Sequence, residues 1–160
     1  MKTKNVIAWL LVVLWMGVIF FFSSMSYHRS NEQSQKVINK LVETTIKVSK
    51  DDKNKVSSNK IKEIVSFLNK PIRKCAHASV FFVLAILLLI AFSVSNIPNK
   101  YLYTIIICFL YALSDEFHQL FVFARTGQFS DVIIDTIGSS IGLFFYFIFN
   151  KFYIKCKANK

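Results

Sequence analysis

The sequence has little glycine, proline and acid. Its 160 residues include four glycines, two prolines and nine acidic residues, against twenty lysines and arginines. So few turn-forming residues argue against a turn-rich β-structure and favour long helices. The three cysteines, Cys75, Cys108 and Cys156, form no CxxC pair, and no HExxH motif occurs. We therefore expect neither a disulfide framework nor a metal site, and no cofactor is indicated.

Hydrophobic residues dominate instead. They make up 54% of the chain, which includes 17 phenylalanines, and the mean hydropathy is +0.45. This is too apolar for an ordinary soluble domain of the same length. Four apolar runs cover residues 6–22, 75–95, 101–123 and 132–149, each close to the length that crosses a bilayer. The runs are continuous rather than alternating, which predicts helices and not the strands of a barrel.

We therefore predict an all-α integral membrane protein, a four-helix bundle forming a single domain over residues 1–160. A long polar loop, residues 23–74, separates the first two spans, and a basic tail covers residues 150–160. Within the loop, residues 37–45 and 61–68 have apolar positions at helical spacing, so the loop contains amphipathic helices. The first run could also be a signal peptide, but no small-residue cleavage site follows it, which favours an anchor.

The net charge of +11 raises the possibility of nucleic-acid binding. Most of the lysines, however, flank the apolar runs or lie in the polar loop. Anionic lipid head groups explain that distribution better, so we expect membrane lipids as partners and no nucleic acid.

Polar residues concentrate at particular ends of the four runs. If all four runs cross the membrane, the end of the first, the start of the second, the end of the third and the start of the fourth lie on one face. The polar residues of that face are Ser23, Ser24, Ser26, Arg73, Lys74, His77, Asp115, Glu116, Gln119, Arg125, Asp131 and Asp135. The opposite face keeps the N-terminus, the NIPNK turn and the lysine tail.

Helical spacing on the fourth run predicts where its acids point. At 100° per residue, Asp131, Asp135, Gly138 and Gly142 fall on one narrow stripe. The two glycines form a GxxxG motif, which lets another helix approach closely, so the stripe and Asp135 face inward. A carboxylate there needs a partner, for which Arg73, His77 and Arg125 are the candidates. Asp131 also fits the N-cap of this helix, and His118, among apolar residues, fits a packing interface.

Three segments carry a family resemblance. They are FFSS at residues 21–24, RKCAHASVFFVL at 73–84 and SDEFHQLFVFARTGQFSDVIIDTIGSSIG at 114–142. In order and spacing the chain resembles the VanZ-like family of small membrane proteins. It departs from the family pattern at Phe123 and Ala124, where Pro-Gly is frequent, and at Phe81, where Tyr is common.

The resemblance implies a link to reduced susceptibility to glycopeptide antibiotics, teicoplanin-type above all. The first functional hypothesis is a cell-envelope factor that binds or alters an envelope lipid, a peptidoglycan component or a glycopeptide-related ligand. The alternative is a membrane-embedded enzyme acting on a phospho-lipid or polyprenyl-linked substrate. A proton-coupled transporter using Asp135 is a third.

No nucleophile is obvious, which favours binding over catalysis. The candidate functional residues are Arg73, His77, Asp115, Glu116, Gln119, Arg125, Asp131 and Asp135, with Gly138 and Gly142 for helix packing. Lysines are densest on the short segments around the termini, so both termini are expected in the cytoplasm and the polar face outside.

Overall fold

The protein is a bundle of helices. In its computed structural model, residues 2–24, 36, 40, 58–122 and 127–158 are described, though not the side chains of residues 2, 58–66, 68–70 and 158. The described helices are α1 (Lys2–Ser23), α3 (Ser58–Val94), α4 (Lys100–Gln119) and α5 (Phe129–Ala158). The described segments contain no strand, and the all-α prediction is confirmed.

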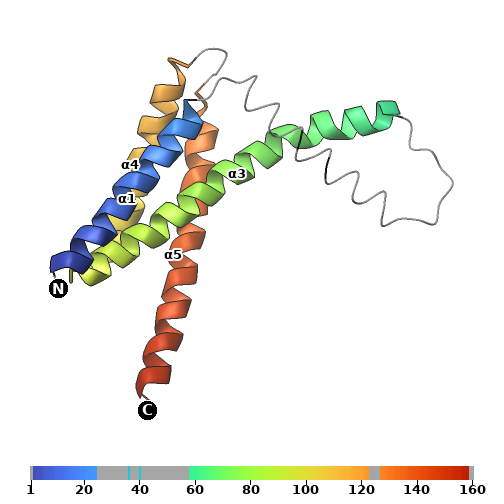
Figure 1. Ribbon diagram of the computed structural model, residues 1–160. Coiled ribbons are helices and arrows are strands. Elements are labelled where there is room, and N and C mark those ends of the chain that lie inside the picture. The colour runs from blue at the N-terminus through green and yellow to red at the C-terminus, as the bar shows by residue number, and fades with distance from the viewer. Residues whose placement is uncertain (1, 25–35, 37–39, 41–57, 123–126, 159–160) are drawn as a thin grey trace.

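Figure 1 shows how the helices are arranged. α3 packs against each of the other three helices and so forms the centre of the bundle. α1 packs chiefly on α3, and α4 packs against both α3 and α5, while the first turns of α3 project away. The start of α1 and the end of α5 lie at the same end of the bundle, as expected for four helices that alternate in direction.

Two boundaries in the first half of the chain differ from the prediction. The expected second span, residues 75–95, and the amphipathic stretch at 61–68 form one helix, α3, which contains Pro71. Proline removes a helical N–H and usually ends or kinks a helix. Pro71 is exposed near the point where α3 leaves the bundle, where the carbonyl of Phe67 can bond to solvent instead. The amphipathic stretch at residues 37–45 lies outside the described part of the chain, apart from Lys40.

The last two helices also differ in extent. α4 ends at Gln119 rather than at residue 123, and Leu120 to Val122 form a turn closed by three backbone hydrogen bonds. α5 begins at Phe129 and continues to Ala158, so the expected basic tail forms the last turns of this helix. Thirty residues of helix span about 45 Å, more than the hydrocarbon core of about 30 Å. The last turns of α5 therefore extend past the bundle (Figure 1).

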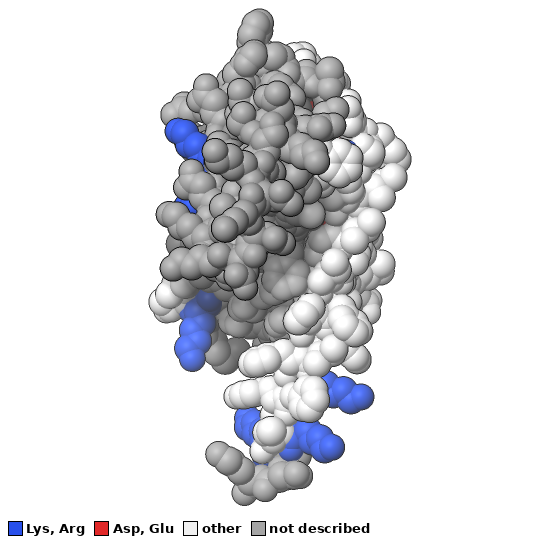
Figure 2. Space-filling model, turned by 90° about the vertical axis from the view of Figure 1, so that its right-hand side faces the viewer, with Lys and Arg blue, Asp and Glu red and all other residues white. Residues whose placement is uncertain are grey.

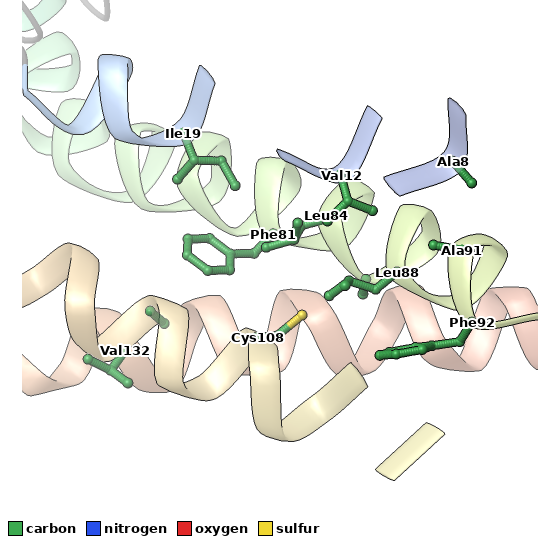
Figure 3. Packing of buried hydrophobic residues seen from close by; sticks show 12 residues of the cluster. Ala8, Val12, Ile19, Phe81, Leu84, Leu88, Ala91, Phe92, Cys108 and Val132 are labelled. Atoms are coloured by element: carbon green, nitrogen blue, oxygen red, sulfur yellow. The ribbon is translucent and has the colours of Figure 1, made fainter. Parts of the chain in front are cut away.

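Close packing of α1, α3 and α4 forms the apolar core. Ala8, Val12 and Ile19 repeat along one face of α1: Ile19 lies near Phe81, Val12 near Leu84 and Ala8 near Ala91 of α3 (Figure 3). The same cluster includes Leu88 and Phe92 of α3, Cys108 of α4 and, at the Phe81 end, Val132 of α5. Most large apolar side chains outside this core are exposed on the helix surfaces, as they are in a helix bundle surrounded by lipid rather than water.

Three helices are long and apolar enough to cross a membrane. The spans are Thr3–Ser23, Pro71–Val94 and Phe129–Lys157, and they identify a membrane protein. α4, which was expected as the third of four spans, does not qualify by composition. Its last turns carry Asp115, Glu116 and His118, which lower its apolar character. Because the two carboxylates are buried against the other helices, α4 nevertheless packs as the fourth member of the bundle.

Candidate functional site

The described buried carboxylates gather at one end of the bundle. This end is formed by the last turns of α1 and α4, the first turns of α5, and the part of α3 that follows Pro71. Ser23, Asp115, Glu116, Gln119 and Asp135 are all buried here. Buried polar groups need hydrogen-bond partners, so the network among them defines the site.

His77 lies between two carboxylates from different helices. Its Nδ1 is 3.0 Å from Oδ2 of Asp135 on α5, and its Nε2 is 3.7 Å from Oδ2 of Asp115 on α4. Asp135 is 1% exposed. It faces the bundle and has a basic partner, as the position of the GxxxG stripe predicted. The imidazole ring is packed against Phe81, one turn further along α3.

Asp115 joins α1 to α4. Its Oδ2 accepts hydrogen bonds from the Ser23 hydroxyl at 2.9 Å and from Nε2 of Gln119 at 3.0 Å. Its Oδ1 is buried and has no hydrogen-bond partner among the described residues. A buried carboxylate oxygen has a strong tendency to accept a hydrogen bond. The second oxygen of Asp115 is therefore available to a donor from outside the described network.

Glu116 fixes the connection that enters α5. One carboxylate oxygen accepts a bond from Nε2 of Gln119 at 3.1 Å, and the other accepts the backbone N–H of Gln128 at 2.9 Å. The chain passes so closely that a Cβ on Gly127 would lie 2.7 Å from the carbonyl oxygen of Glu116. Only glycine fits there without a shift. Glu116 therefore chiefly holds the backbone before α5 in place, a role that the sequence did not indicate.

An ion pair covers the more exposed edge of the site. Lys74 Nζ donates to Oδ1 of Asp131, and the two side chains are 28% and 23% exposed. Asp131 lies in the first turn of α5 rather than at its N-cap, where its charge also favours the helix dipole. Arg73, the predicted basic residue on this stretch, is partly buried beside Lys74.

The GxxxG motif positions these acids by bringing α5 against α3. A Cβ added at Gly138 would lie 2.3 Å from the carbonyl oxygen of Ala78, and one at Gly142 would lie 2.6 Å from that of Phe82. Both glycines therefore lie where α5 comes closest to the backbone of α3. Ser139, which the sequence analysis missed, is buried one turn below Asp135 and donates to its backbone carbonyl. Its i, i+4 spacing from Asp135 was the available signal.

His118 lies outside this network. Its ring stacks on Phe20 with ring centroids 4.1 Å apart, and its Nε2 is 3.1 Å from the Ser24 hydroxyl. It therefore packs α4 against α1, the interface role that its apolar surroundings indicated. Two predicted members of the polar face, Ser26 and Arg125, lie outside the described residues, as do Phe123 and Ala124.

A comparison with protein-family models shows to which family the chain belongs. The family model described as VanZ/LLP1 matches residues 8–150, nearly the whole sequence. The chain belongs to the VanZ-like family. Comparisons with curated proteins and with solved structures gave no match.

The three sequence segments that resembled VanZ-like proteins converge at the polar end of the bundle. Ser23 comes from the first segment, Lys74 and His77 from the second, and Asp115, Glu116 and Asp135 from the third. Residues far apart in sequence are thus joined in one network across four helices.

The chemistry available to this VanZ-like site is hydrogen bonding and proton transfer. Asp115 and Asp135 lie on either side of one imidazole, and Glu116 is buried next to Asp115 in the chain, so the interior of the site is rich in acceptor oxygens. Lys74 and Arg73 place positive charge nearer the surface. Within the described segments, no group of His, Cys, Asp or Glu has the geometry to hold a metal ion. The arrangement suits a ligand that carries hydroxyl or amide donors inward and a negative charge outward.

Proposed function

We propose that the chain is a multi-pass protein of the cell membrane and a cell-envelope factor. It binds or alters an envelope lipid or a peptidoglycan component, and so lowers susceptibility to teicoplanin-type glycopeptide antibiotics. The main support is the His77 imidazole held between Asp115 and Asp135 at one end of an apolar bundle. Charged groups inside a membrane protein are costly and are kept mainly where they serve a function.

The ligand that fits best is a lipid-linked cell-wall precursor or another anionic envelope lipid. Oδ1 of Asp115, which has no partner among the described residues, would accept a hydrogen bond from a hydroxyl or amide of the head group. Lys74 and Arg73 would lie near its phosphate, and the acyl or prenyl chain would remain in the bilayer. Each part of such a molecule meets groups of complementary charge and polarity.

The orientation that suits this role places both termini in the cytoplasm. The end opposite the site carries lysines at the start of α1 and the end of α5, and lysines favour the cytoplasmic side. The polar site would then open outward, where glycopeptides act. A reporter fused after Lys160 and assayed on both sides of the membrane tests this orientation, and an external signal would reverse it.

The function is tested by antibiotic susceptibility in a glycopeptide-susceptible Gram-positive host. We expect the wild-type chain to raise the minimal inhibitory concentration of teicoplanin. His77→Gln should lose that effect, because glutamine lacks the pair of ring nitrogens that face Asp135 and Asp115. Ser140→Ala is the matched control, since its hydroxyl is exposed and bonds only to its own helix at Thr136. The proposal fails if His77→Gln, present in the membrane in normal amount, protects as well as the wild type.

A membrane-embedded enzyme is the second candidate, and the placement of His77 favours it. A histidine oriented by one carboxylate is a common general base, and such a base contributes about 10²- to 10⁴-fold to a rate. His77 would take a proton from water as the water attacks a phospho-lipid or polyprenyl-linked phosphate, and the lipid alcohol or phosphate would leave. Incubating purified protein with these lipids and following product release separates binding from turnover.

A further inference from the structure

Among the described residues, the charged side chains toward the end of the bundle opposite the polar site are all positive. No acidic residue occurs in residues 1–31, 64–114 or 136–160. The described lysine side chains near the helix ends on this side are Lys4, Lys100, Lys151, Lys155 and Lys157. On the face drawn in Figure 2, the coloured charged side chains around the lower end of the molecule are basic. Along α4, Asp115 is about 22 Å from Lys100, too far to neutralise it.

Lys100 is held in a defined position at this end. Its Nζ donates to the Ser93 hydroxyl at 2.8 Å, and that oxygen is 2.9 Å from the Tyr146 hydroxyl. The same Nζ lies 5.5 Å from the ring centroid of Tyr101 and 5.4 Å from that of Tyr146. Aromatic rings and neutral hydroxyls orient an ammonium group but do not cancel its charge. Lys100 is thus fixed without a carboxylate among its described partners.

An open hollow of about 500 Å³ lies beside Lys100, lined in part by Ser93, Asn96 and Asn99. α4 begins at Lys100, and Asn99 before it has a left-handed backbone with φ 53° and makes no side-chain cap. The first N–H groups of α4 therefore lie near the hollow, and the positive end of the helix dipole adds to the Lys100 charge. From the same helix, the Tyr103 ring lies beside that of Phe92, which lines the hollow. Tyr103 is exposed, as are Ile106 and Leu110 further along α4, and the three form a largely apolar stripe.

We propose that the hollow beside Lys100 is a binding site for an anionic phospholipid of the leaflet opposite the polar site. The lipid phosphate supplies the counter-charge that no described residue provides beside Lys100. One acyl chain lies along the exposed stripe of Tyr103, Ile106 and Leu110. This stripe favours a lipid over free phosphate, because inorganic phosphate has nothing to place there.

Lipid retention by purified protein tests the site. Delipidated protein in detergent is titrated with phosphatidylglycerol, with phosphatidylcholine or with inorganic phosphate, and bound molecules are counted by native mass spectrometry. We expect the wild type to retain one phosphatidylglycerol in preference to phosphatidylcholine. Inorganic phosphate at the same concentration should not displace it. A wild type without this preference, or a lipid displaced by inorganic phosphate, overturns the proposal without any variant.

Two lysine substitutions distinguish a specific phospholipid site from non-specific electrostatic attraction between lipids and lysines. Lys100→Gln should weaken the tightest phosphatidylglycerol by about tenfold or more, as expected for loss of a charge-assisted bond. Lys155 lies toward the same end of the protein but is not held between aromatic rings of the described residues. Lys155→Gln should therefore weaken phosphatidylglycerol binding by less than about fivefold. Equal losses would show diffuse attraction and refute the site. Lys100→Arg, which keeps the charge, should retain the lipid. Loss of binding in a folded Lys100→Arg would also count against the role assigned to the charge.

Discussion

Adding one methyl group at Gly138 should separate α3 from α5. The Cβ of Gly138→Ala would lie 2.3 Å from the carbonyl oxygen of Ala78, about 1.1 Å closer than the 3.4 Å of an ordinary contact. The obstacle is backbone in the middle of a helix, so it cannot rotate away as a side chain can. The helices must move apart, which loosens packing along the whole GxxxG stripe.

The expected loss of stability can be estimated from the effect of overpacking in other protein cores. Forcing extra atoms into a packed interior costs about 1–3 kcal/mol. For a protein of this size, about 2 kcal/mol lowers the melting temperature by about 4–8 °C. The intrinsic preference of a helix for alanine, about 1 kcal/mol, acts in the opposite direction. Gly17→Ala is therefore the control, because it has the same helical preference and no atom within 4 Å of the added Cβ.

Thermal unfolding of both variants in the same detergent gives the answer. We expect Gly138→Ala to melt several degrees below the wild type and Gly17→Ala to melt at or above it. Gly142→Ala, with its Cβ 2.6 Å from the Phe82 carbonyl, should fall between them. Equal melting temperatures for Gly138→Ala and Gly17→Ala would contradict the α3–α5 contact that positions Asp135.

Three further substitutions test the network and its edges. Ser23→Ala removes a donor from buried Asp115, so detergent unfolding should show a loss of about 1–3 kcal/mol; a neutral result would mean the hydroxyl is dispensable. Lys74→Met breaks an ion pair that is about a quarter exposed. It should cost no more than about 1 kcal/mol while reducing teicoplanin protection, and full protection would remove Lys74 from the site. Tyr111→Phe removes the hydroxyl that donates to a backbone carbonyl of α1 at 2.6 Å. A loss of about 0.5–1.5 kcal/mol is expected, and no change would argue against this α1–α4 contact.

The helices and the polar end were predictable because both depend on simple rules. Long apolar runs determine membrane helices, and alternating direction places the ends of adjacent helices together. The stripe of Asp135, Gly138 and Gly142 was predictable because helical geometry is nearly constant. The partner of Asp135 was limited to three residues but not to one, since spacing gives a direction within a helix and not the rotation of its neighbour.

Other features depend on contacts that the sequence does not reveal. The continuation of α3 through Pro71 could not be predicted, because proline most often ends a helix. Arg73 and Lys74 are adjacent, and only the packed structure shows that Lys74 pairs with Asp131. The bond from Gln128 to Glu116 involves backbone, which leaves no sequence signal. The clamp around Lys100 joins residues 93 and 146, whose separation in sequence hides their contact.

Direct binding tests the central claim that the polar end receives an envelope component. Purified protein would be titrated with a polyprenyl-linked peptidoglycan precursor, and with polyprenyl phosphate, by native mass spectrometry or calorimetry. We expect saturable binding by the wild type and by Ser140→Ala. Binding should be at least about tenfold weaker in His77→Gln, which removes the imidazole between Asp115 and Asp135 and takes a hydrogen-bond partner from the buried Asp135 carboxylate. If His77→Gln binds both lipids as tightly as the wild type, or if none of the three proteins binds either lipid, the polar end is not the receptor that the structure led us to propose.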